Sequence, residues 1–166
     1  MTQTQPRTRT FTWSDPSLNA EALGQRSGLE TLHAISAGEL PPPPIMHTLG
    51  IDRIVADEGR VAVFMPVGEF HYNPLGTVHG GVLATLLDTA TGCAVHSTLP
   101  AGVGYTSLDL TTKFLKPVTV QSGTLRCEGT VISRGKRHAL AEARLFDERG
   151  QLVAHATSSC LLFPVG

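Results

Sequence analysis

The chain has 166 residues, which is the length of one domain with room for a substantial core. Its 13 basic and 14 acidic residues leave a formal net charge of −1, so no strong field favours nucleic acid or an anionic membrane surface. No apolar run is long enough to span a membrane, and the first residues lack the layout of a signal peptide. The three cysteines have neither metal nor redox spacing and are typical of buried thiols in a reducing compartment. We therefore expect a cytoplasmic protein with no nucleic-acid or membrane partner.

Residues 1–44 are predicted to form an arm that precedes the compact body. Residues 1–16 are rich in Thr, Gln and Arg and have the composition of a loosely ordered segment. Ser17 is a candidate cap for a helix, and Gly24 and Gly28 make two short helices as compatible with the pattern as one. The four prolines at 41–44 cannot continue a helix and are predicted to be extended. The boundary with the main domain, residues 45–166, is placed there.

Strand signals begin at residue 45. The apolar-rich runs 49–56 and 61–67 flank Asp57-Glu58-Gly59, which predicts a hairpin turn. Residues 68–78 contain Asn, Pro and Gly and are predicted to be a loop that leads into a helix.

The segment from Val82 to Val95 is predicted to be that helix. It is too long and too poor in β-branched residues for a strand, and it is apolar on every face, which is typical of a helix buried all round. Four strand-like runs follow, at 104–115, 118–132, 138–147 and 151–163, and small residues dominate the inward positions of the last two. Such a sheet can lie close to a helix. The predicted class is α+β: a curved antiparallel sheet wrapped around one long central helix, with an N-terminal helical arm.

Asp88 and the glycine pair Gly80-Gly81 are the exceptions in this helix. An ionised carboxylate in apolar surroundings is costly unless it is paired or used. Glycines at a helix start leave backbone N–H groups open to an anion or a polarised carbonyl. Eight residues separate Gly80 from Asp88, which is about 12 Å along the axis, so one carbonyl group cannot contact both. Two antiparallel helices would bring Asp88 of one chain to Gly80 of another, which predicts a site shared across a dimer.

The sequence around the helix start resembles a known family. It reads Asn73-Pro74-Leu75-Gly76-Thr77-Val78-His79-Gly80-Gly81 and is followed by Asp88, with Ser107-Leu108-Asp109-Leu110 and Phe114-Leu115-Lys116-Pro117 on the next strand. This pattern, over about residues 45–163, is similar to the hotdog-fold acyl-CoA thioesterases and closest to the phenylacetate-degradation (PaaI-type) group. The resemblance implies a hotdog fold, a tetramer built from two dimers, and no metal or redox cofactor, since coenzyme A is part of the substrate.

The resemblance also implies a role for each matching residue. Asp88 matches the acid that acts as nucleophile or as general base for water, and Gly80 matches the glycine whose N–H polarises the thioester carbonyl from the partner chain. Asn73 matches a polar loop residue that orients water or substrate. His79 matches the histidine that fixes the helix start, and Ser107 matches a hydroxyl that positions the attacking water.

Each of these residues also has a simpler interpretation. The sequence is compatible with an Asp88 that only bonds to backbone at a kink, with glycines at 80 and 81 that serve only close packing, and with an Asn73 that forms an Asx turn before a proline. His79 and Ser107 are as compatible with a structural or solvated role as with a chemical one.

The cluster Arg134, Gly135, Lys136 and Arg137 is the only local group of basic residues and is predicted to form a hairpin tip. It is either a solvated turn or a contact for the phosphates of coenzyme A. Two other functions stay open for the whole chain. One is a hotdog-fold enoyl-CoA hydratase or dehydratase, which needs a His paired with an acid. The other is a non-catalytic acyl-CoA-binding protein.

Overall fold

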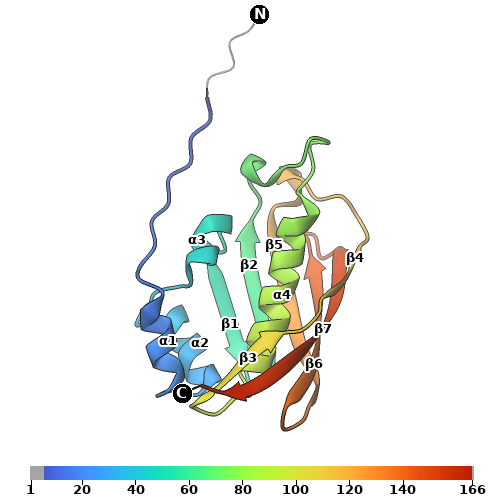
Figure 1. Cartoon of the computed structure of the whole chain (residues 1–166). Helices are drawn as coiled ribbons and strands as arrows, with labels where there is room; N and C mark the ends of the chain where they lie inside the picture. Colours follow the sequence, from blue (N-terminus) through green and yellow to red (C-terminus); the bar gives the residue numbers. More distant parts are fainter. Residues whose placement is uncertain (1–5, 166) are drawn as a thin grey trace, which may run out of the picture.

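The computed structural model describes residues 6–165. Their strands form one antiparallel sheet that curves around a single long helix, α4 (Gly80–His96) (Figure 1). The sheet order is β1-β2-β5-β6-β7-β3, and β4 lies beside β7. The strands are β1 (Arg53–Asp57), β2 (Arg60–Pro66), β3 (Val103–Ser107), β4 (Thr111–Phe114), β5 (Thr124–Arg134), β6 (His138–Phe146) and β7 (Leu152–Pro164). The predicted architecture is confirmed.

Small residues let the sheet approach the helix, as expected from the alternation. Ala141, Ala143 and Ala156 are fully buried on the inner face. At Gly129 in β5, a Cβ atom would lie 2.1 Å from the carbonyl oxygen of Ala90 in α4. The backbones of sheet and helix therefore meet at a point where only glycine fits.

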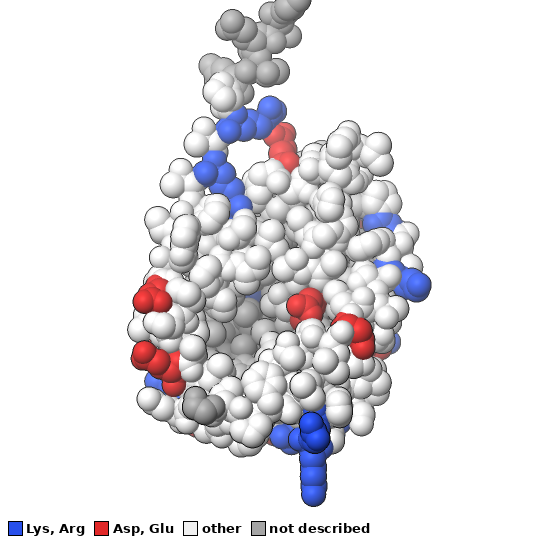
Figure 2. All heavy atoms as spheres, viewed as in Figure 1, with Lys and Arg blue, Asp and Glu red and all other residues white. Residues whose placement is uncertain are grey.

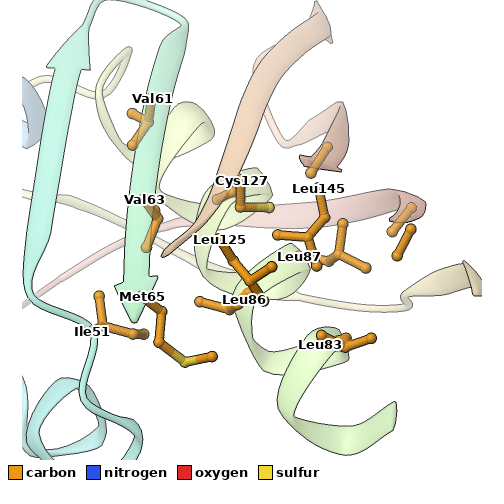
Figure 3. Close-up of a cluster of buried hydrophobic side chains, with 14 of the residues drawn as sticks. Ile51, Val61, Val63, Met65, Leu83, Leu86, Leu87, Leu125, Cys127 and Leu145 are labelled. Atoms are coloured by element: carbon orange, nitrogen blue, oxygen red, sulfur yellow. The ribbon is translucent and has the colours of Figure 1, made fainter. Parts of the chain in front are cut away.

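The core fills the space between α4 and the concave face of the sheet. Figure 3 shows side chains of α4 meeting those of β2, β5 and β6. The labelled residues are Ile51, Val61, Val63, Met65, Leu83, Leu86, Leu87, Leu125, Cys127 and Leu145. Burying each large side chain of this kind contributes about 1.5–3 kcal/mol to stability.

One side of α4 is not covered by the sheet, so the expectation of a helix buried all round is wrong for the single chain. Gly81 is exposed, and Thr85, Asp88 and Thr89 are half-buried along the same stripe. The Thr85 hydroxyl donates to the Gly81 carbonyl at 2.9 Å, and that of Thr89 donates to the Thr85 carbonyl at 2.7 Å. This open stripe has small side chains whose hydroxyl groups are satisfied within the helix.

The arm contains α1 (Ser17–Leu23) and α2 (Gly28–Ser36), so the version with two short helices is confirmed. Ser17 does not cap α1, because Pro16 holds the N-cap position and makes no side-chain cap bond. Ser27 caps α2 instead, in a capping box with Glu30. These helices lie against the main body in Figure 1.

The junction between arm and body differs from the prediction. Pro44 is the first residue of helix α3 (Pro44–Leu49), a position where proline is favoured because its missing N–H has no helical partner. Strand β1 consequently begins at Arg53 and not at residue 49. Leu32 of α2 belongs to the main core, so the arm packs as part of the body; the boundary at residue 45 stays a prediction.

The predicted strand 104–115 is divided into β3 and β4. Between them, the Ser158 hydroxyl donates to the carbonyl of Asp109 at 2.8 Å, and the Ser159 N–H donates to the Asp109 carboxylate at 3.1 Å. At Asp109, hydrogen bonds that involve side chains therefore replace the regular backbone hydrogen bonds with β7. The next strand, β5, starts at Thr124 because a short 3₁₀ turn (Val120–Ser122) precedes it.

None of the helices in residues 6–165 has the length and apolar character needed to cross a membrane.

Candidate functional site

Asp88 lies on the open stripe of α4, where its carboxylate faces the end of β3. The Ser107 hydroxyl donates a hydrogen bond of 2.8 Å to Asp88 Oδ1. The two residues border a surface hollow of about 330 Å³ whose other walls are Ala84, Thr85 and residues 108–110. Asp88 is half-buried, so a small molecule in the hollow can reach a carboxylate that is already oriented by a neighbouring hydroxyl.

The start of α4 is organised by His79. Its ring nitrogen Nδ1 accepts the Gly81 N–H at 2.9 Å, which makes His79 the N-cap of the helix. The Gly81 amide is therefore engaged, contrary to the expectation that both glycine amides are free. The Gly80 N–H has no hydrogen-bond partner within residues 6–165, so the donor available at this helix start is that of Gly80.

Asn73 forms the Asx turn that was one of its two interpretations. Its Oδ1 accepts the N–H groups of Leu75 at 2.9 Å and Thr77 at 3.3 Å, and its Nδ2 donates to the Thr77 hydroxyl at 3.0 Å. Because the amide carries two hydrogens, one donor remains. Asn73 and Gly80 line a second hollow of about 360 Å³, which Phe114 and Lys116 also border.

The expected site residues thus fall into two separate groups in one chain. Asp88 is brought together with Ser107, and Asn73 is brought together with Gly80, and the two hollows have no lining residue in common. Since Gly80 and Asp88 lie eight residues apart in one unbroken helix, about 12 Å separates them along the axis. A single chain therefore does not place the carboxylate and the free amide around one carbonyl group.

A model of the thioesterase superfamily matches residues 75–154, which include Gly80, Asp88 and Ser107. Human acyl-coenzyme A thioesterase 13 is 30% identical over 105 residues, which are 63% of this chain and 74% of that enzyme. The chain belongs to the thioesterase superfamily.

Solved structures show that the similarity to thioesterases also holds for the fold of this chain. The phenylacetic acid degradation-related protein of Ralstonia eutropha matches with a TM-score of 0.71 and 32% identity, over 78% of this chain and 98% of that chain. The PaaI protein of the Escherichia coli phenylacetic acid degradation operon matches with a TM-score of 0.70 and 27% identity, over 84% and 94%. Curated relatives are matched over 66% to 91% of their own length. The resemblance to PaaI-type hotdog thioesterases is confirmed, and the chain is a thioester hydrolase.

The predicted basic cluster at residues 134–137 lies elsewhere on the surface of the thioesterase. Arg134, Lys136 and Arg137 are exposed at the tip of the β5–β6 hairpin, where the Gly135 N–H bonds to the His138 carbonyl at 2.8 Å. None of the four tip residues lines the Asp88 hollow or the Asn73–Gly80 hollow. Their contact with coenzyme A stays a prediction, as do the chemical roles of the residues above.

Two side chains near Asp88 were not singled out from the sequence. Burial raises the pKa of the Cys93 thiol to about 12, and the Asp88 carboxylate adds to the effect, so Cys93 is a neutral thiol at neutral pH and not a nucleophile. Burial likewise raises the pKa of the Tyr105 phenol well above its usual value. Tyr105 lies two residues before Ser107 in β3, so it is on the same face of the sheet. That spacing is the signal in the sequence that could have identified it.

Residues 6–165 contain no group of three or more His, Cys, Asp or Glu side chains that could hold a metal ion. The neighbour that this chain supplies to the Asp88 carboxylate is a hydroxyl and not a histidine. This arrangement gives no support to the hydratase alternative, which requires a paired histidine and acid.

Proposed function

We propose that the chain is an acyl-CoA thioesterase that hydrolyses a small, medium-chain or aromatic acyl-CoA to the free acid and coenzyme A. The observation that carries the proposal is the Asp88 carboxylate, which Ser107 orients in an open hollow. It lies on the helix whose first amide has no partner in the described part of the chain. The name of the human relative, an acyl-coenzyme A thioesterase, supports the substrate class.

Thioester hydrolysis needs a nucleophile at the carbonyl carbon and a donor for the oxyanion that forms. The Gly80 N–H is that donor, and it comes from a second chain whose α4 packs antiparallel on the open stripe of the first. Losing one donor of this kind typically costs about 2.7–4 kcal/mol of transition-state stabilisation. A backbone amide has a fixed position and no net charge, so it suits an oxyanion that exists only briefly.

Asp88 supplies the nucleophile by one of two routes. As a general base it takes a proton from water, the hydroxide oxygen bonds to the carbonyl carbon, and the C–S bond breaks to release the thiolate of coenzyme A, which is then protonated. As a nucleophile its carboxylate attacks the carbonyl carbon, the thiolate leaves, and water hydrolyses the resulting anhydride. Ser107 positions Asp88 and the attacking water in both routes.

The remaining roles follow from the loop before α4. Asn73 has one free amide hydrogen that can bind water or the thioester oxygen. His79 fixes the helix start so that the Gly80 amide points outward. The Gly81 N–H is held by His79 and is not available to the substrate. Gly81 contributes to substrate binding only because it has no side chain to block the approach. Arg134, Lys136 and Arg137 contact the phosphates of coenzyme A as flexible, exposed cations.

We also propose that the active form is a homodimer at least, and a tetramer of two dimers in the cell. The dimer is required because one chain separates the carboxylate from the amide. Three free cysteines, Cys93, Cys127 and Cys160, fit a reducing cytoplasm.

The direct test is purified Asp88→Asn protein with a panel of acyl- and aroyl-CoA substrates, followed by release of the free thiol. We expect turnover to fall by at least about a hundredfold, because an amide is neither base nor nucleophile. Unchanged turnover would remove the assignment. Hydration of enoyl-CoA without thiol release would support the hydratase, and saturable binding without any hydrolysis would support the binding protein.

A single-turnover reaction in ¹⁸O-labelled water can identify the nucleophile route for Asp88, because only that route can place label in the protein. In the nucleophile route the water attacks an anhydride, and attack at the Asp88 carbonyl leaves label in the protein, where mass spectrometry of the peptide detects it. In the general-base route all label enters the released acid.

A further inference from the structure

A third cavity, of about 420 Å³, lies between the arm and the C-terminal half of α4. Ala20, Leu23 and Ile35 of α1 and α2 form one wall, and Cys93, His96 and Tyr105 belong to the other. Figure 2 shows this face of the molecule hollowed between the N-terminal helices and the central helix. The arm lies outside residues 75–154, the part of the chain that the superfamily model matches.

The cavity is suited to an uncharged, apolar occupant. None of its lining residues is Asp, Glu, Lys or Arg. Burial lowers the pKa of His96, so this ring is neutral at neutral pH and adds no charge. Cavities of about 150 Å³ already bind benzene, so the volume here is ample for an alkyl segment of several carbons.

Tyr105 lies between this cavity, which it lines, and the Asp88 hollow. Its ring lies against Gly92, where a Cβ atom would be 2.7 Å from the phenol oxygen. Gly92 is one helical turn after Asp88, and Ser107, the partner of Asp88, is on the same face of β3 as Tyr105. An acyl chain that starts at Asp88 and follows α4 toward its C-terminus must pass the Tyr105 ring to reach the cavity, because the ring packs against Gly92 between the two.

We propose that this cavity binds the distal part of the acyl chain, so that the N-terminal arm sets the chain-length preference of the enzyme. The inference rests on the proposed acyl-CoA thioesterase function and deepens it. Cys93 and His96 lie five and eight residues beyond Asp88, or about 7 and 12 Å along the axis. With about 1.3 Å of reach per carbon of an extended chain, derived from the C–C bond length, about six carbons reach the cavity and nine or ten fill it. The preferred substrate is thus a medium-chain acyl group.

The test uses coenzyme A thioethers, which bind but cannot be hydrolysed, in the full-length protein. Calorimetry compares S-ethyl-, S-hexyl- and S-decyl-CoA with the wild type and two tryptophan variants. Ala20→Trp fills the cavity from an exposed position of α1, so the core is not disturbed. Glu21→Trp is the matched control, because Glu21 is the next residue of the same helix, is exposed and does not line the cavity.

Each methylene buried in the cavity is expected to raise affinity about fourfold at full burial. Wild-type protein and Glu21→Trp should therefore bind S-decyl-CoA at least about thirtyfold more tightly than S-hexyl-CoA, and Ala20→Trp should lose most of this gain. All three proteins should bind S-ethyl-CoA equally well. An equal gain in Ala20→Trp, or no gain beyond S-hexyl-CoA in the wild type, overturns the proposal.

These outcomes are distinguishable from failure of the proposed function. If thioesters are cleaved with no preference for length and the thioethers show no gain, the cavity assignment alone is wrong. If the thioethers show the gain and no thioester is cleaved, the cavity assignment stands and the hydrolase assignment is wrong.

Discussion

Gly80→Pro removes the backbone N–H at the start of α4 while the local backbone can accept the new ring. Proline is favoured at the first position of a helix, and Gly80 is that residue. The residue before a proline must be extended, and His79 already has ψ 136°. A Cβ atom at Gly80 lies 3.2 Å from the ring of Phe114, which is 54% exposed and can move aside. The substitution therefore deletes the proposed oxyanion donor with little cost to folding.

We expect the rate constant kcat of Gly80→Pro to fall by about 10²–10³, the usual effect of losing one oxyanion donor. Gly80→Ala is the control, since it introduces the same Cβ contact with Phe114 and keeps the N–H. It should retain activity within about threefold of the wild type. The assay is release of free thiol from a medium-chain acyl-CoA, and circular dichroism checks that both variants are folded.

Mixing this variant with Asp88→Asn tests whether the site is shared. In a mixed dimer, one site combines the intact Asp88 of one chain with the intact Gly80 of the other, and the second site has neither group. Random exchange of equal amounts places half of the molecules in mixed dimers, so activity should return to about a quarter of the wild-type rate. No recovery after verified subunit exchange would refute the two-chain site, because a site within one chain is defective in every subunit.

Three further predictions concern the site and its supports. Ser107→Ala removes the hydroxyl that donates to Asp88, and kcat/KM should fall about tenfold, the low end for a hydrogen bond to a charged group that is partly exposed. Gly28→Ala would place a Cβ atom 1.7 Å from the His96 carbonyl oxygen; we expect a loss of about 2–3 kcal/mol and a clear fall in Tm. Burial lowers the pKa of His71 and of His96 below the usual histidine value of 6.5. The unfolded chain therefore binds more protons below pH 6.5, and the free energy of unfolding should decrease as the pH falls from 6.5 toward the folded-state pKa values. Urea denaturation across this range measures it.

Each of these predictions has its own control. Ser107→Thr keeps the hydroxyl and should recover most of the loss. Gly24→Ala should leave Tm nearly unchanged, because the nearest atom to its Cβ is 3.8 Å away. His96→Leu should flatten the dependence on pH, and a dependence as steep as in the wild type would contradict the assignment of His96.

The parts of the site that lie close together in sequence could be predicted from sequence alone. The distance between Gly80 and Asp88 follows from the rise of one helix, so their separation needs only the residue spacing. The capping role of His79 is also local in sequence, but only the resemblance to the family implied it. The hydrogen bond from Ser107 to Asp88 spans 19 residues, and only the resemblance to the family pointed to it.

Three predictions about local structure were wrong: the single strand over 104–115, the extended conformation of Pro44 and the free amide of Gly81. Asp109 takes two bonds from β7 and divides the expected strand, and residues of this kind are compatible with either a strand or a turn. Pro44 begins a helix that a run of four prolines concealed, because the same residue ends one helix and favours the first position of the next. The engaged amide of Gly81 depended on the ring orientation of His79, which composition does not reveal.

The composition of α4 connects the fold with the proposed two-chain site. Its residues are small or apolar apart from Asp88 and the terminal His96, and on the sheet side this allows contacts as close as that of Gly129 with Ala90. On the open stripe the same small side chains leave a surface without unsatisfied hydroxyl groups, against which a second helix can pack closely. A large or charged residue there would separate the helices of the proposed dimer and move Asp88 away from the proposed oxyanion donor. The helix can therefore serve as core on one side and as a dimer contact on the other, with its single carboxylate at the edge between them.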